Sequence, residues 1–202
     1  MNSLPFNGFD LALAVILILG IVRGRKQGMS MELMPLITWL VVLFVSAVAY
    51  EPIGSFFSGT VTLFDTLRCY LMAYTGAALL IVMVFAGLKR SLGGKLIGSD
   101  MFGRAEYYLG MGSGLVRFAC ILLVGLAVLN ARLYTVEEVR AEERFQNDVY
   151  GSHFFPTLHG VQATVFEHSL TGPWIKENLG FLLIKPTQPQ DVALHQKDAK
   201  WQ

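Results

Sequence analysis

Apolar residues gather into four long runs over the first two thirds of the chain. The runs cover residues 9–22, 29–50, 69–88 and 107–129, and short polar segments separate them. A helix rises 1.5 Å per residue, so about 20 apolar residues cross the ~30 Å hydrocarbon layer of a membrane. The pattern therefore predicts four transmembrane helices. The first reaches sufficient length when it is counted from Leu4, with Asp10 at the membrane surface.

The polar segments predict where each helix ends. Glu51 and Pro52 follow the second run, and we expect them to stop its helix and open a loop that extends to Arg68. In the first segment the cations follow the apolar run, whereas a secretory signal peptide has them in front. We therefore expect an uncleaved membrane anchor.

The distribution of cations predicts the orientation. The first-to-second connection carries Arg23, Arg25 and Lys26. The third-to-fourth connection carries Lys89, Arg90, Lys95 and Arg104, whereas the connection between them has only Arg68. Because flanking Lys and Arg stay in the cytoplasm, both basic connections are expected inside and both termini outside.

The composition changes after residue 131. Residues 132–202 hold seven Lys or Arg and nine Asp or Glu, and none of their apolar runs is long enough to span a membrane. We expect a charged helix over 136–150, a second helix from Pro156 that ends at Gly172 and Pro173, and an apolar patch over 174–184 that lies along the lipid surface. The predicted units are a membrane domain (1–131), an amphipathic helical extension (132–184) and a disordered tail (185–202).

Overall composition agrees with an all-α polytopic membrane protein that has a mostly helical extramembrane segment. The 202 residues are 53% hydrophobic and 15% charged, with a mean hydropathy of +0.50. The net charge is +1, with cations scattered among acids, so no cationic face is available for nucleic acid. The lipid bilayer is the expected partner.

The fourth run contains a single charge, Arg117, among several glycines. At 100° per residue it shares one stripe of the helix with Gly110, Gly114, Ile121 and Gly125, so this stripe is expected to face protein. A charge at the membrane centre costs ~2.5–3.5 kcal/mol on insertion scales. Arg117 is therefore expected to snorkel, to close a structural hydrogen-bond network, or to act on an ion or solute.

Glu32 is the expected partner of Arg117, because it begins the second run on the same side of the membrane. Gly110 and Gly114 form a small-xxx-small motif that can pack helices within one subunit or between two copies. Packing within one subunit is the favoured interpretation, and a homo-oligomer is the alternative.

Two stretches resemble the colicin V production protein family. The first has Asp10, then Arg23-Gly24-x-Lys26-x-Gly28, Glu32-Leu33 and Trp39; the second is Gly110-x-x-x-Gly114-x-x-Arg117. The likeness covers residues 9–130. The family usually has an Asp-Arg pair before the first of these glycines, where this chain has Glu106-Tyr107. The resemblance implies a small bacterial inner-membrane protein with four spans, linked to colicin V toxin production or export and to envelope upkeep, with no established chemistry.

The sequence offers no constellation for catalysis. The four histidines (153, 159, 168 and 195) lack the spacing of a metal site, and Cys69 and Cys120 lie inside apolar runs. We therefore expect no enzyme, cofactor or metal. The favoured function is a non-enzymatic accessory factor that acts with other membrane or secretion proteins. The alternative is a small oligomeric channel or transporter that uses Arg117 and Glu32. Arg23 and its neighbouring cations set topology and can also meet anionic lipids.

Overall fold

The computed structural model describes residues 7–60, 65–92, 103–150 and 157–188, most of which are helical. The long helices are α1 (Gly8–Thr60), α2 (Thr66–Leu92) and α3 (Glu106–Asn130). The shorter elements are η2 (Gly103–Ala105), α4 (Val136–Tyr150), α5 (Leu158–Phe166), α6 (Thr171–Asn178) and η3 (Gly180–Leu182).

Helix α1 is bent into two arms at Gly28. This residue has φ 74° and ψ 167°, which is outside the helical region, while the residues before and after it are helical. Only glycine adopts this backbone conformation readily, because it has no Cβ. We call residues 8–27 the first arm and residues 29–60 the second arm.

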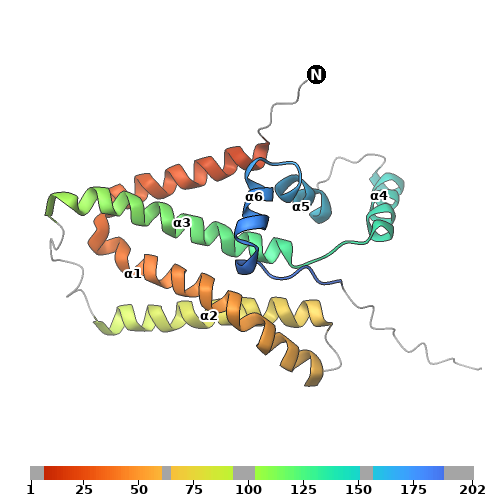
Figure 1. Ribbon diagram of the computed structural model, residues 1–202, viewed down its shortest axis with the longest axis horizontal. Coiled ribbons are helices and arrows are strands. Elements are labelled where there is room, and N and C mark those ends of the chain that lie inside the picture. Colours follow the sequence, from red (N-terminus) through yellow and green to blue (C-terminus); the bar gives the residue numbers. More distant parts are fainter. Residues whose placement is uncertain (1–6, 61–64, 93–102, 151–156, 189–202) are drawn as a thin grey trace, which may run out of the picture.

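Helix α3 lies between the two arms, and α2 packs beside the second arm (Figure 1). The bend of α1 and the start of α3 meet at one end of the molecule, where Ser30 contacts Glu106. The start of α1 lies at the other end with α5 and α6 (Figure 1). The two basic connections predicted from the sequence therefore begin at one end, opposite the start of α1.

Three helices in the described part of the chain are long and apolar enough to cross a membrane: α1, α2 and α3. The sequence pattern predicted four spans. The difference lies in α1, which contains both the first and the second predicted spans as one helix of 53 residues with a bend. The helices expected over 69–88 and 107–129 are present as α2 and α3.

The second arm continues past the point where the sequence predicted a loop. Glu51 and Pro52 do not end the helix, which extends to Thr60. A proline removes one backbone hydrogen bond, and packing can compensate for this loss. Here Gly54 is buried against the Tyr70 ring of α2, where an added Cβ would overlap the ring. This contact between the two helices explains why the helix continues.

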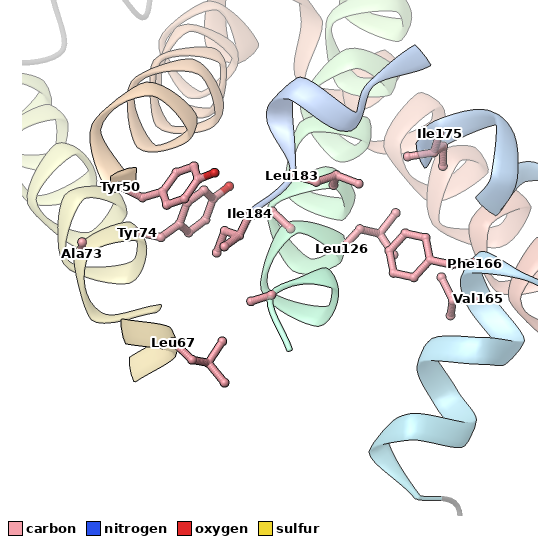
Figure 2. Packing of buried hydrophobic residues seen from close by; sticks show 12 residues of the cluster. Tyr50, Leu67, Ala73, Tyr74, Leu126, Val165, Phe166, Ile175, Leu183 and Ile184 are labelled. Atoms are coloured by element: carbon pink, nitrogen blue, oxygen red, sulfur yellow. The ribbon is translucent and has the colours of Figure 1, made fainter. Parts of the chain in front are cut away.

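The largest buried cluster joins the end of the second arm to α2, α3 and residues 157–188, which we call the C-terminal segment. The rings of Tyr50 and Tyr74 stack edge to face, with centroids 6.3 Å apart. Figure 2 shows Ile184 and Leu183 lying between these tyrosines and Leu126 of α3. The C-terminal segment is therefore part of the core.

This finding corrects the prediction that residues 174–184 lie along the lipid surface. Ile175, Leu182, Leu183 and Ile184 are buried. Trp174 and Phe181 are exposed, so only part of the predicted apolar patch faces outward. The sequence alone could not show that α3 and the second arm leave a space that these side chains fill.

Asp10 fastens the start of α6 to the start of α1. Its carboxylate accepts hydrogen bonds from the backbone amides of Leu170 and Thr171, at 3.0 and 3.2 Å, and from the Thr171 hydroxyl at 2.6 Å. The amides at a helix start have no partner within the helix, and a carboxylate there is stabilising. Asp10 is itself buried. It was expected at the membrane surface, and the structure adds this long-range contact.

The helix expected from Pro156 ends earlier than predicted. α5 stops at Phe166, and Gly172 and Pro173 lie in the first turn of the separate helix α6. Proline is tolerated in a first turn because the amides there lack helical partners anyway. Gly172 packs so closely on the Val165 carbonyl that a side chain would not fit.

The polar segment that follows Ile184 is held against the rest of the chain. The Asn130 side chain donates a 2.9 Å hydrogen bond to the Ile184 carbonyl, and Thr187 pairs with Arg132 in a short parallel bridge. The sequence assigned residues 185–202 to a disordered tail. Residues 185–188 are instead fixed by these contacts, and residues 189–202 lie outside the described residues.

We predict that Asp10→Ala loosens the C-terminal segment. The substitution leaves three amides (Asn7, Leu170 and Thr171) and the Thr171 hydroxyl without their acceptor, at a cost of about 1.5–3 kcal/mol for bonds to a charged group. Hydrogen exchange of residues 168–178 in detergent should become faster, while exchange in α2 stays unchanged. Glu177→Ala is the control, since it removes an exposed carboxylate from α6, the helix whose start Asp10 holds. Equal exchange in the two variants would contradict the role of Asp10.

Candidate functional site

The candidate site lies where the bend of α1 meets the first half of α3. The Glu106 carboxylate, at the start of α3, accepts hydrogen bonds from the Ser30 amide at 2.7 Å and the Ser30 hydroxyl at 3.1 Å. The Ser30 amide belongs to the first turn after the bend, where amides lack helical acceptors. A Cβ at Gly28 would lie 2.7 Å from Glu106 Oε1, so both the backbone and the neighbouring carboxylate require glycine.

Glycines on both helices bring the first arm and α3 into backbone contact. A Cβ at Gly110 would lie 2.5 Å from the Gly24 carbonyl oxygen and 2.9 Å from the Gly28 Cα. A Cβ at Gly114 would overlap the Gly20 carbonyl oxygen. In lipid, helices associate through close packing of this kind, because burial from water is not available as a driving force. The structure uses the motif within one chain, as the favoured interpretation expected.

Arg117 and Glu32 form an ion pair directly beyond the glycine contact. Arg117 Nη1 lies 2.6 Å from Glu32 Oε2. The Glu32 side chain has 0% exposure and that of Arg117 has 15%. The guanidinium also lies 5.5 Å from the centre of the Phe118 ring. The partnership expected from the sequence is therefore present, and it links α3 to the second arm.

Part of this ion pair has no partner among the described residues. Glu32 Oε1 and Arg117 Nε are buried and accept or donate no hydrogen bond there. An ion pair that is shielded from water is stable only when its remaining polar atoms are satisfied.

The remaining predicted residues lie apart from the ion pair. Arg23 is exposed on the first arm near the bend. Gly125 is exposed too, with no heavy atom near an added Cβ, so the protein-facing stripe of α3 ends before it. The predicted stripe extended too far along α3, because two helices that cross touch over a few turns only.

The described histidines do not gather with acids or thiols. No group of three or more His, Cys, Asp or Glu side chains within the described residues could hold a metal ion. The His159 ring stacks on Tyr134 at 5.4 Å between centroids, and burial raises the pKa of the Tyr134 hydroxyl. At the second arm, Lys185 donates to Glu51, whose carboxylate raises the pKa of the Lys185 ammonium.

The family model described as Colicin V production protein matches residues 9–163. The match includes both arms of α1 together with α2 and α3. The chain belongs to this family. Comparison with curated proteins and with solved structures gives no match. The family match extends past residue 130, where the sequence resemblance ended, so α4 and most of α5 are within it.

Membership in the colicin V production family agrees with the apolar helices, and the protein is a membrane protein of that family. The site contains residues that the sequence reasoning missed. One is Gly20, which precedes Gly24 and Gly28 at the same spacing of four residues. Because residues four apart lie on one face of a helix, this spacing could have identified Gly20 from the sequence. Glu106 departs from the family pattern, but the sequence did not predict its role. Its hydrogen bonds to Ser30 join residues 76 positions apart, and the local sequence does not indicate such a contact.

We predict that Gly114→Ala separates the first arm from α3. The added methyl group meets the Gly20 carbonyl, and overpacking costs about 1–3 kcal/mol. The unfolding midpoint in a titration with SDS should fall. Gly112→Ala is the matched control on the same helix, because Gly112 is exposed with open space around it. The Gly112→Ala substitution should make α3 about 0.5–1 kcal/mol more stable, because alanine favours a helix over glycine. Similar shifts for both variants would rule out the close contact.

We predict strong coupling between Glu32 and Arg117 in a double-mutant cycle. Either Glu32→Met or Arg117→Met alone leaves the partner charge buried, and such losses cost about 3–5 kcal/mol. The double variant replaces both charges with apolar side chains and should be no less stable than either single variant. SDS unfolding of the four proteins gives the coupling free energy. Strictly additive effects would show that the two side chains act independently.

Proposed function

We propose that this protein is a non-enzymatic accessory factor of the bacterial inner membrane, active in toxin production or export or in envelope upkeep. The helices of the membrane domain hold the C-terminal segment in a fixed position for another membrane or secretion protein. The single observation that carries this proposal is the attachment of α6 and residues 182–187 to both arms of α1 and to α3, through Asp10, Tyr50 and Asn130. A disordered extension would need no such attachment.

The contact surface in this proposal is α4. Its start is fixed by a capping box, in which Thr135 and Glu138 exchange hydrogen bonds of 3.1 and 3.3 Å. Figure 1 shows α4 standing away from the long helices. Val136, Phe145 and Val149 are apolar and exposed on this charged helix. An ordered helix with uncovered apolar side chains is suited to bind a partner.

In the proposed topology each arm of α1 crosses the membrane, which gives four crossings. The first arm has 20 residues, from 8 to 27, so it spans about 30 Å at the helical rise. Two features support this arrangement. The bend lies beside the start of α3, and the start of α1 lies beside α6. Both basic connections would then be cytoplasmic, with both termini outside.

A channel or transporter is the second candidate function. The observation that favours it is that two buried atoms, Glu32 Oε1 and Arg117 Nε, have no hydrogen-bond partner within the part of the chain that the structure describes. An ionisable group inside a membrane is a candidate for moving ions or solutes. In that case Arg117→Ala should abolish flux into liposomes.

We predict that a photo-crosslinking residue at Phe145 captures another envelope protein in native membranes. The same residue at Met83 is the control, because Met83 is at least as exposed as Phe145 but lies on α2 among exposed apolar side chains that would face lipid. The crosslinking residue at Met83 should give no protein adduct. Mass spectrometry of the adducts identifies the partner. Crosslinks at Met83 alone, together with solute flux that depends on Arg117, would replace the accessory role with transport.

A further inference from the structure

A hollow opens between the first arm of α1 and the start of α3, outside the glycine contact. One wall consists of Val22, Arg25 and Lys26, and the other of Tyr107, Tyr108 and Met111. The volume of the hollow is about 760 Å³. The backbone contact between Gly24 and Gly110 holds the two walls at a fixed separation.

The hollow carries positive charge. Within the described residues neither Arg25 nor Lys26 forms an ion pair. The Glu106 carboxylate accepts hydrogen bonds from Ser30 and is not among the side chains that line the hollow. Two cations therefore remain available to an anion. Guanidinium and ammonium groups both bind phosphate, and the hydroxyls of the opposite wall can donate to the same oxygens.

The other side chains of the hollow point to a lipid in place of a free anion. Val22 and Met111 lie one turn deeper than the cations and the tyrosines, and they make the floor apolar. Below the floor the first arm exposes Val15, Ile18 and Leu19. An apolar surface thus continues from the charged hollow along the helix, as acyl chains require. Tyr107 and Tyr108 are 60% and 75% exposed, which suits residues at the level of lipid headgroups.

We propose that this hollow binds the headgroup of an anionic phospholipid, with its acyl chains along the first arm. Arg25 and Lys26 contact the phosphate, and the hydroxyls of Tyr107 and Tyr108 complete its coordination. The lipid covers the outer side of the contact between Gly24 and Gly110. This assignment is independent of the proposed accessory role and of any transport.

The test is lipid retention by the full chain in nanodiscs made of equal parts phosphatidylglycerol and phosphatidylcholine. After the protein is released from the nanodiscs, native mass spectrometry counts the lipids that remain bound to it. The wild-type protein should retain phosphatidylglycerol in preference to phosphatidylcholine. Arg25→Gln with Lys26→Gln should weaken this retention about thirtyfold, since each cation contributes about a factor of five. Tyr107→Phe with Tyr108→Phe should give a smaller loss.

The matched control is Lys89→Gln with Arg90→Gln. These residues are exposed cations at the end of α2 and do not line the hollow, so the change in net charge is the same. This variant should retain phosphatidylglycerol as the wild type does. Equal losses in both double variants would show general charge attraction and overturn the site. Displacement of the lipid by inorganic phosphate alone would overturn the assignment to a phospholipid. SDS unfolding midpoints confirm that the variants are folded.

Discussion

The close approach of the first arm of α1 to α3 is the constraint on which the rest of the structure depends. Gly24 and Gly110 let two backbones touch, and no larger side chain fits between them. Apolar surface gains nothing when it leaves lipid for another apolar surface, so such packing must hold membrane helices together. The bend at Gly28 places the second arm on the other side of α3, where it meets Arg117 through Glu32.

The buried ion pair depends on this arrangement. Each charge alone would be costly in a membrane, and each becomes tolerable because its partner is 2.6 Å away. The pair also fixes the register of α3 against the second arm, because a shift by one turn would separate the charges. Glycine packing against the first arm and an ion pair with the second arm, both from one stripe of α3, thus position both arms.

The other end of the molecule is organised by hydrogen bonds to long-range partners. Asp10 holds the start of α6, and Asn130 holds the Ile184 carbonyl. These bonds place Leu183 and Ile184 in the core beside Tyr50 (Figure 2). The C-terminal segment therefore completes the packing between α3 and the second arm.

The sequence by itself determined the membrane class, the helices of α2, α3 and α4, and the candidate pair of Glu32 and Arg117. These features follow from hydropathy over one helix length and from the rarity of charges in lipid. Only the tertiary structure decided that α1 continues through Pro52, that Glu106 caps the bend, and that residues 182–187 are fixed in place. Such features depend on contacts between residues far apart in the chain, and local sequence does not record which surfaces meet.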